Sequence, residues 1–502
     1  MEIVPSTLLA LVCVLGLLIQ GPYRGLWIFF AVTPLGAAAA FNLPALGGAS
    51  ILIPDIAALT MLGLVAIHRG GPAMIAGTMR YGQPGFWLML LAVYAVFSAL
   101  FLPRVFAGQT EVFSLARKAN EVGIVEVPLR ASSGNITQLF RLMLGVATYL
   151  AVATVFRLRP DAAMVLKAVA IATGINVALG VLDVLSYEAG VATILDPIRS
   201  ANYAILYDVR MIGVKRMIGG YPEASSFGFY TLGLFGFWLQ YWFGTPKSRL
   251  ALTMLLLTTI ALLHSTSSAA YVALVIFLVL LAGVGLTSNL RHRLHRRGTL
   301  IAVGGLLVAL LAALALFAGY ELVSPARQFF DRALLDKLQG ASGVERMSWN
   351  AQAFENFRDT LGFGAGLGSI RASSWLMATL ASLGILGTLC ALMFIGSVLA
   401  GREGRRGADQ RAVVIRALRA ACLALVLSAV LTGATPDLGV TFFAFAGLAA
   451  GLARGAILQR RKTPAARSRR IGQSPNNPPA APALSPDGDR NGPDYGSNLA
   501  KS

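Results

Sequence analysis

Long apolar runs constrain this sequence more than any other feature. Runs of about 17–25 residues, the length that a helix needs to cross a bilayer, recur along most of the 502 residues. Hydrophobic residues make up 56% of the chain and charged residues only 13%, which is about half the charged fraction of a soluble domain. The runs are continuous rather than alternating, which argues against a transmembrane β-barrel. The sequence therefore predicts an all-α polytopic integral membrane protein.

Thirteen candidate spans can be placed along the chain, of which the first, second and last are the weakest. They are 6–20, 25–41, 52–67, 85–102, 137–156, 162–186, 225–243, 249–264, 267–287, 299–318, 374–400, 412–432 and 437–454. One early segment could be re-entrant, so about 12–13 transmembrane helices are expected. The longest connection, 319–373, separates the tenth and eleventh spans. Residues 1–458 would form one transmembrane domain, and 459–502, rich in Pro, Asn and Ser, a disordered tail.

The distribution of charge predicts the orientation of these spans. The net charge of +19 is concentrated in the tail and in short connections such as 291–298 and 401–411. This is the positive-inside pattern, which puts those connections and the C-terminus in the cytoplasm. Connections 103–136, 187–224 and 319–373 mix both signs and are expected outside. No aromatic-interleaved basic surface accompanies the charge, which argues against a nucleic-acid partner.

The first outward segment with candidate functional residues reads RMIGGYPEASSFGFY, residues 216–230, and it lies directly before an apolar run. Charges at membrane depth are costly and usually mark a site. Arg216 and its neighbour Lys215 can donate to phosphate oxygens, the arginine in a bidentate fork. Glu223 borders a low-dielectric region, which suits a general base. The structural alternative is an ordinary interfacial pair of Arg216 and Glu223, snorkelling or bound to each other.

The second outward segment is the connection 319–373. It has roughly 55 residues, and loops longer than about 15 residues in compact proteins are usually functional or disordered. Trp349, Phe354 and Phe357 recur at spacings of five and three, which indicates a helix that folds back on the membrane surface.

A glycine-rich stretch, GFGAGLGSIR, ends this connection. In this stretch Gly362, Gly364, Gly366 and Gly368 alternate with other residues, and Ser369 follows. A nest of free backbone N–H groups before a helix suits an anion, and the flanking Arg346 and Arg371 reinforce that interpretation. It is not a nucleotide-binding P-loop, because no Lys-Ser/Thr pair follows the glycines. A flexible hinge is the alternative.

The third outward segment is LLHSTSSAAYVAL, residues 262–274, whose Ser and Thr side chains can bend a helix. His264 is the only histidine expected on this side and is a candidate substrate contact, although a lone histidine at a helix end is more often structural. The outer loops show no Asp/Glu/His cluster with ligand spacing. We therefore expect no metal and no cofactor.

Taken together, these segments resemble the O-antigen polymerase and ligase superfamily over about residues 210–455. The matches are R-x-x-G-x-x-x-E-x-S at Arg216, Gly219, Glu223 and Ser225, the Ser/Thr-rich break at 265–268, the block from Glu345-Arg346 through GFGAGLGS to SWLMATLASLGILG, and the ending PDLGVTFFAFAGLAAG at 436–451.

This resemblance implies a bacterial inner-membrane glycosyltransferase with a periplasmic site. Its substrate would be an oligosaccharide carried on undecaprenyl diphosphate, polymerised into exopolysaccharide or O-antigen without a metal. Arg216 and Arg346 would bind the diphosphate leaving group, with Arg371 beside them. The E-x-S form of the first motif looks like that of exopolysaccharide polymerases and favours Glu223 as the base. The partners would be a flippase and a chain-length regulator.

Two other functions remain open. Within the same family, an O-antigen ligase transfers finished glycan to a lipid A core or a protein. Such ligases place a histidine in the large outward loop, and this chain has none between 319 and 373. A transporter or flippase of lipid-linked sugar would carry charges along a path through several spans. Here the spans contain little beyond Asp183 and Arg141.

Overall fold

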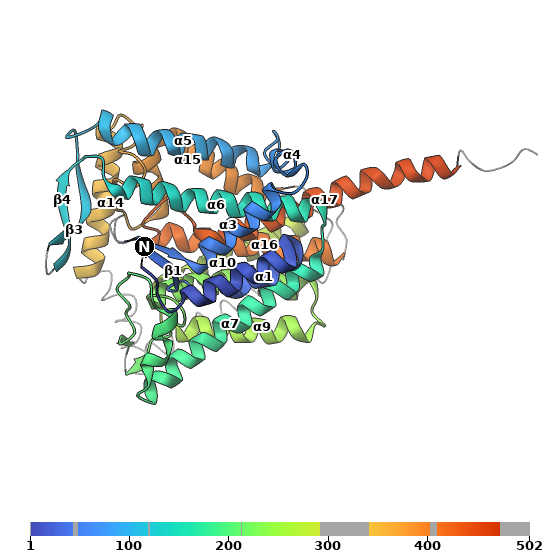
Figure 1. The fold of residues 1–502 in the computed structure, drawn as a ribbon, viewed down its shortest axis with the longest axis horizontal. Helices are drawn as coiled ribbons and strands as arrows, with labels where there is room; N and C mark the ends of the chain where they lie inside the picture. The colour runs from blue at the N-terminus through green and yellow to red at the C-terminus, as the bar shows by residue number, and fades with distance from the viewer. Residues whose placement is uncertain are drawn as a thin grey trace, which may run out of the picture. The chain divides into compact units, whose positions relative to one another are not determined.

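The computed structural model is mostly helical (Figure 1). It describes residues 2–43, 49–118, 121–211, 213–291, 341–401 and 409–471. The chain divides into two compact units, Met1–Ile457 and Leu458–Ser502. The first unit holds every element discussed below except the last part of the final helix.

The helices define the scaffold of the first unit. They are α1 (Thr7–Arg24), α2 (Leu26–Val32), α3 (Ile53–Ala66), α4 (Gly71–Ala76), α5 (Pro84–Val105), α6 (Ser133–Leu158), α7 (Ala162–Glu188), the 3-10 helix η2 (Ala192–Ile198), α8 (Ala224–Gly244), α9 (Arg249–His264), α10 (Ser268–Arg291), α14 (Ala341–Asp359), α15 (Trp375–Leu399), α16 (Gln410–Thr432) and α17 (Gly439–Ile471).

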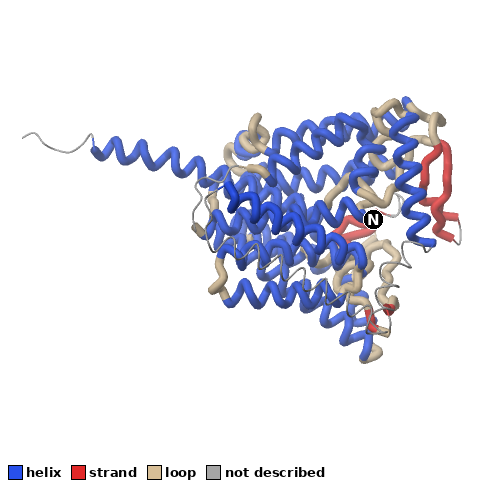
Figure 2. Tube along the Cα trace, turned by 180° about the vertical axis from the view of Figure 1, so that it is seen from behind, coloured by secondary structure: helices blue, strands red, loops and turns tan. Residues whose placement is uncertain are grey.

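In the described part of the chain, three antiparallel strand pairs lie in the connections between helices, and they are seen in red in Figure 2. They are β1 (Ala39–Leu43) with β2 (Ala49–Leu52), β3 (Glu111–Lys118) with β4 (Glu121–Pro128), and β5 (Arg210–Met211) with β6 (Val214–Lys215). In the longest pair Glu111 lies opposite Pro128 and Lys118 opposite Glu121.

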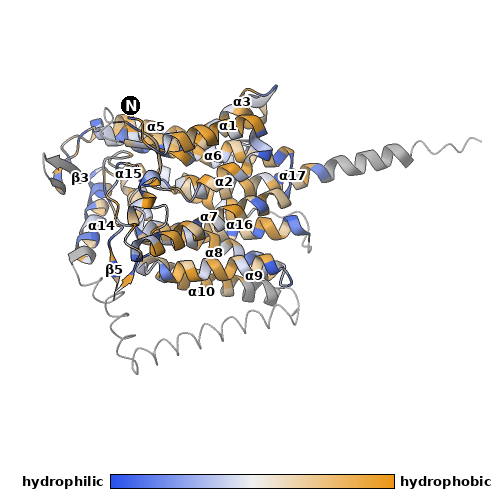
Figure 3. Ribbon diagram, turned by 60° about the horizontal axis from the view of Figure 1, so that its bottom comes forward, coloured by the Kyte–Doolittle hydropathy of each residue, from blue (hydrophilic) through white to orange (hydrophobic). Residues whose placement is uncertain are grey.

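The prediction of an all-α polytopic membrane protein is confirmed at the level of helix length and composition. In the described parts of the chain, seven helices are long and apolar enough to cross a membrane: α1, α5, α6, α7, α15, α16 and α17. Apolar residues run along the helices, as the orange ribbon in Figure 3 shows. On α1, Leu11, Leu15 and Leu18 are exposed at helical spacing, as expected of a face in contact with lipid. The candidate span 299–318 lies outside the described residues.

The prediction of a span over 25–41 is wrong. The helix α2 ends at Val32, and after a turn the chain enters strand β1. Pro34 has no backbone N–H with which to continue the hydrogen bonds of the helix, and a Cβ at Gly36 would lie 2.4 Å from the Tyr221 ring, so glycine permits the close approach at this turn. The backbone of Ala37, which follows, accepts from Ala201 N at 2.9 Å and donates to Gly220 O at 2.8 Å. This segment therefore supports the loop that carries the first motif.

The helix α8 is the best-buried helix near that motif. Its aromatic side chains Phe227, Phe237 and Trp238 are fully buried, and it packs closely along α16. A Cβ atom at Gly233 would lie 2.8 Å from the Leu425 side chain, so the glycine permits this close approach. The N-terminus of α8 is therefore held rigidly.

Several connections gather at one end of the helices in the first unit. In Figure 1 the hairpin of β3 and β4 lies beside α14 at the left. Gln352 Nε2 of α14 donates to the Glu111 carbonyl at 2.8 Å, and Asn356 Nδ2 donates to Thr110 Oγ1 at 2.8 Å. The prediction of a helix around Trp349 is confirmed, and the hairpin that holds it was not predicted.

The second unit begins within α17. This helix continues to Ile471, whereas the sequence analysis expected disorder from 459. Its residues beyond 459 are mostly Arg, Lys and Ala, which are strong helix formers. The remainder of the predicted tail, 472–502, lies outside the described residues.

Candidate functional site

Asp183 anchors the segment that carries the first motif. It lies in the apolar helix α7, where an acid requires a partner, and its side chain is 1% exposed. Lys215 Nζ lies 2.9 Å from Asp183 Oδ2, and Arg199 Nη2 donates to Oδ1. Oδ2 also accepts from the backbone N–H of Ile218 at 2.9 Å. These bonds fix the backbone on both sides of Arg216.

The same cluster changes the role of Lys215, which was predicted to contact substrate. Its side chain is 1% exposed, and besides Asp183 its ammonium donates to the Arg216 carbonyl at 3.1 Å. Burial lowers the pKa of Lys215, and the Asp183 carboxylate opposes that effect. The structure therefore assigns Lys215 to holding the segment in place and leaves it no free ammonium for a ligand.

Arg216 reaches from the end of β6 to the turn between α9 and α10. Nε donates to Thr266 Oγ1 at 3.1 Å and Nη2 to the Thr266 carbonyl at 3.3 Å. Thr266 has φ of 47°, a strained conformation for a residue other than glycine, and such strain is concentrated at functional sites. Burial lowers the pKa of Arg216, while the nearby Glu223 opposes that effect. Nη1 has no hydrogen-bond partner among the described residues, so it can bind a ligand.

Glu223 is the N-cap residue of α8, with extended backbone geometry. Its Oε1 accepts from Ser225 Oγ and, at 3.5 Å, from Ser226 Oγ. A negative charge is favourable at a helix N-terminus, and the two hydroxyls orient the carboxylate there. Within the described chain Oε2 has no hydrogen-bond donor. One oxygen is therefore fixed and the other is open to accept a proton.

A pocket of about 150 Å³ brings Arg216 and Glu223 together with Arg346. Arg346 is an exposed residue of α14, far along the chain from the first motif. The first turns of α8 and α10 also line the pocket, through Ser225 and Ser268. The three residues predicted to be catalytic thus line one pocket, although they come from separate segments.

The electrostatics of this pocket favour an anion. Two arginines outweigh the single carboxylate of Glu223. The N-termini of α8 and α10 add positive partial charge, because their first N–H groups have no partner within the helix. A diphosphate can take donors from an arginine fork and from helix N–H groups at once.

The glycine-rich loop does not form the predicted anion-binding nest. Gly364 N donates to Thr360 Oγ1 at 3.1 Å, and Gly366 N donates to the Ser382 carbonyl at 3.2 Å. Gly366 has φ of 99°, and a Cβ there would lie 2.4 Å from Pro103 Cγ. These N–H groups are used within the protein, so the prediction of a free nest is wrong for them. The close packing also argues against a hinge.

Two further predicted ligand-binding residues extend this packing. Gly368 has φ of 84°, and a Cβ there would lie 2.4 Å from the Gly134 carbonyl oxygen at the start of α6. Ser369 is 8% exposed, and its Oγ accepts from Asn135 Nδ2 at 2.8 Å. Both residues join the loop to α6, outside the pocket that holds Arg216.

Arg371 stacks on α14 instead of lining the pocket. Its Cζ lies 4.5 Å from the ring centroid of Trp349, a cation–π contact. Burial lowers the pKa of Arg371, and the nearby Arg346 lowers it further. The contact braces the helix that carries Arg346, so Arg371 influences the pocket through its position and charge.

His264 also lies outside the residues that line the pocket. It ends α9, and its carbonyl accepts from Met217 N at 3.4 Å. Its Nε2 is buried with no hydrogen-bond partner among the described atoms. The geometry gives its backbone a part in holding the first motif and does not bring its ring to Glu223.

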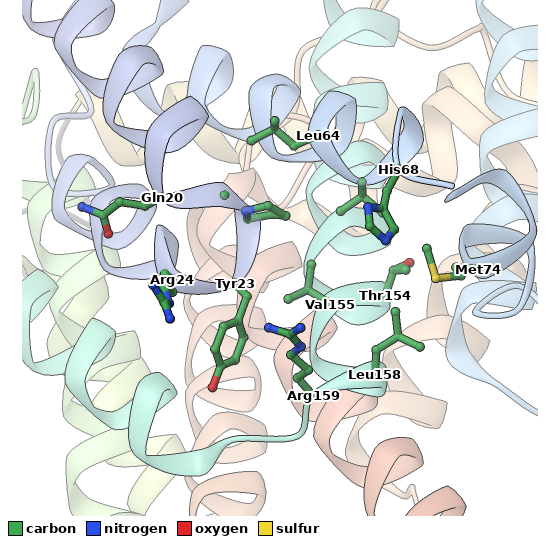
Figure 4. A pocket seen from close by; sticks show the side chains of 13 residues that line it. Gln20, Tyr23, Arg24, Leu64, His68, Met74, Thr154, Val155, Leu158 and Arg159 are labelled. Atoms are coloured by element: carbon green, nitrogen blue, oxygen red, sulfur yellow. The ribbon is translucent and has the colours of Figure 1, made fainter. Parts of the chain in front are cut away.

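A larger cavity, of about 400 Å³, lies among the C-terminal ends of α1, α3 and α6 (Figure 4). Arg24, His68 and Arg159 line it, together with Tyr23. Tyr23 already donates to Asp161 Oδ2 at 2.6 Å, and the Arg159 guanidinium lies over its ring. No carboxylate lines this cavity, and none of the residues that the sequence motifs single out lies in it.

Sequence reasoning missed Asp183, Arg199 and Thr266 as supports of the site. A single acid inside an apolar helix was the available signal for Asp183, since it predicts a buried cationic partner. No protein-family model and no curated protein matches the chain. The pocket of Arg216, Glu223 and Arg346 is therefore the main structural indication of function.

Proposed function

We propose that this chain is a membrane-embedded glycosyltransferase that polymerises oligosaccharide repeats carried on undecaprenyl diphosphate. The observation that carries the proposal is the pocket that gathers Arg216, Glu223 and Arg346 beside two helix N-termini. An anion site with an oriented carboxylate is what transfer from a lipid diphosphate requires. Membership of the O-antigen polymerase and ligase superfamily, expected from the motifs, is part of the same proposal.

The proposed reaction balances with groups on this chain. The free oxygen of Glu223 takes the proton of an acceptor hydroxyl, and the hydroxyl oxygen bonds to the anomeric carbon of the donor. The bond between that carbon and the diphosphate oxygen breaks. Arg216 and Arg346 neutralise the charge that develops on the departing lipid diphosphate. Glu223 then releases its proton to water, and no metal is needed in this scheme.

The proposal includes a setting in the bacterial inner membrane. We place the pocket on the periplasmic side, with about 12–13 spans, the large loop 319–373 outside and the C-terminus in the cytoplasm, because Arg and Lys are concentrated in the opposite connections. A flippase would supply the lipid-linked repeats, and a chain-length regulator would act beside the polymerase.

The test is the glycan profile of cells that lack the gene and are complemented with wild type, Arg216→Ala or Arg346→Ala. We expect both variants to accumulate single lipid-linked repeats and to lose at least about 90% of long polymer, since losing a charge-stabilising donor costs about 10²–10³ in rate. Arg216→Lys should rescue poorly, because a point charge does not replace a bidentate fork.

Arg358→Ala is the matched control. Arg358 lies on the same helix as Arg346, but it is exposed and paired with Glu355. It should leave polymer length unchanged. Normal polymer in Arg216→Ala cells at wild-type protein level contradicts the site. Long polymer that stays on its lipid carrier in cells lacking the gene contradicts a polymerase and identifies a ligase.

A further inference from the structure

A second pocket, of about 330 Å³, holds charged groups that the proposed reaction does not use. Asp55 of α3, Arg141 of α6 and Asp437, between α16 and α17, line it together with Tyr203 and Tyr221. Its volume is within the range of small-molecule sites. Buried polar and charged groups usually have hydrogen-bond partners within the protein, so any of their atoms without one is a candidate for binding a ligand.

Each of these charged side chains uses only part of its hydrogen-bonding capacity within the protein. Asp55 Oδ2 accepts from Leu52 N at 2.9 Å, and Asp437 Oδ1 accepts from Gly439 N at 3.1 Å. In the described chain the second oxygen of each carboxylate has no donor. Arg141 Nη2 donates to Tyr203 Oη at 2.6 Å.

No ion pair joins Arg141 to Asp55 or Asp437 within the described residues, although the three interact electrostatically. The pocket therefore presents open acceptors and open donors across one space. A ligand that both donates and accepts hydrogen bonds at several points fits it, which is the chemistry of a sugar's hydroxyl groups. A divalent cation fits poorly, because the described residues offer no group of three or more His, Cys, Asp or Glu side chains that could hold one, and Arg141 adds a positive charge.

The two pockets adjoin along three segments of the chain. Glu223, Ala224 and Ser225 line the first, while Pro222 and Ser226 line the second. The segment 203–206 and the segment 432–437 likewise contribute to both. Ser226 Oγ lies 3.5 Å from Glu223 Oε1, so the carboxylate is at the boundary. A ligand in the second pocket therefore lies beside the proposed base.

We infer that the pocket lined by Asp55, Arg141 and Asp437 binds the acceptor sugar, whose attacking hydroxyl it presents to Glu223. This assignment rests on the proposed function, because it names the second substrate of the same site. Asp55 and Asp437 accept from sugar hydroxyls, Arg141 donates to a sugar oxygen, and Tyr203 holds the guanidinium in position.

The experiment measures binding of two probes to the purified full chain in detergent. One probe is the oligosaccharide released by mild acid from the host's own exopolysaccharide, and the other is undecaprenyl diphosphate. We expect Asp437→Asn and Asp55→Asn each to weaken oligosaccharide binding at least about tenfold, as expected for loss of a hydrogen bond to a charged group. Both should bind undecaprenyl diphosphate as wild type does, which also shows that they are folded.

Two comparisons separate this inference from the proposed function. Arg346→Ala should weaken the diphosphate and leave the oligosaccharide unchanged. Asp196→Asn, an exposed acid of η2, should change neither. Oligosaccharide affinity unchanged in both acid variants, or absent in a wild type that binds diphosphate, overturns the acceptor pocket alone. Diphosphate affinity unchanged in both Arg216→Ala and Arg346→Ala overturns the proposed function.

Discussion

Charged residues near the first motif differ in what surrounds them, and this difference separates their roles. Lys215 and Arg199 share the Asp183 carboxylate and are almost fully buried. Arg216 is held by Thr266 through two of its nitrogens and keeps one for a ligand. Sequence alone puts both Lys215 and Arg216 beside phosphate, because adjacent basic residues give no sign of which one meets a buried acid.

The buried carboxyl group of Asp437 should make the stability of the protein depend on pH. Burial raises its pKa from 3.8 to about 6, and Asp55 raises it further while Gly439 N and Arg141 oppose the change. Between these values the folded state holds a proton that the unfolded state has released, so the free energy of unfolding falls as pH rises through this window. At about pH 7.5 the full cost of the buried carboxylate is present. Asp437→Asn removes it and should raise the apparent Tm by about 1–3 °C.

The measurement is thermal unfolding of both proteins in detergent at about pH 7.5 and about pH 4.5. The gain should shrink at the lower pH, where wild-type Asp437 is neutral in the folded state. Asp55 still balances the charge of Arg141 in the variant. An equal gain at both pH values would contradict this account. A stabilising change that also weakens acceptor binding would show that the carboxylate is retained for function at the expense of stability.

At the scale of helices and strands, the hydrophobic pattern predicted most elements near the site. The helix around Trp349 and the break between α9 and α10 both occur. The hairpin of β3 and β4 was not predicted, because the mixed charge of 103–136 indicates an outward connection but not the pairing of strands within it. The span 25–41 failed because apolar composition alone does not separate a helix from a buried strand such as Ala39–Leu43.

The attachment of α7 to the first motif predicts the effect of Asp183→Asn. This change leaves Arg199 and Lys215 buried without a counter-charge and weakens the bond to Ile218 N. Breaking a buried pair from one side typically costs about 3–5 kcal/mol. We expect a marked fall in apparent Tm and loss of diphosphate binding, measured on the purified protein.

Glu188→Gln is the matched control for that variant. Glu188 ends the same helix and pairs with Arg210 at 3.9 Å, but both side chains are about half exposed. Exposed pairs contribute little to stability. An equal fall in apparent Tm for both variants would show that the buried cluster has no special role in holding the motif.

Across the whole first unit, the pocket depends on contacts that sequence order does not reveal. Arg346 reaches it because α14 is bound to the β3–β4 hairpin through Gln352 and Asn356 and is braced by Arg371. The motifs predicted which residues carry charge, since charge near apolar runs is informative by itself. They did not predict that N–H groups of the glycine-rich loop would be hydrogen-bonded within the protein, because the sequence does not distinguish a free backbone N–H group from a bonded one.

The proposed orientation of the membrane helices can be tested by the accessibility of two exposed positions to a reagent that does not cross the inner membrane. Gln109, beside the β3–β4 hairpin, and Lys247, between α8 and α9, are both exposed. Gln109 lies in the connection 103–136, expected outside, and Lys247 in the basic connection 244–249, which the positive-inside pattern puts in the cytoplasm. The native Cys13 and Cys422 are buried and Cys390 lies within α15, so a cysteine-free background should fold after substitution by Ala or Ser. With the outer membrane permeabilised, a charged maleimide should label Gln109→Cys at once and Lys247→Cys only after the inner membrane is opened. Labelling in the reverse order would put the pocket in the cytoplasm, where a base and an anion site would meet nucleotide-linked donors, and the proposed lipid-linked chemistry would lose its setting.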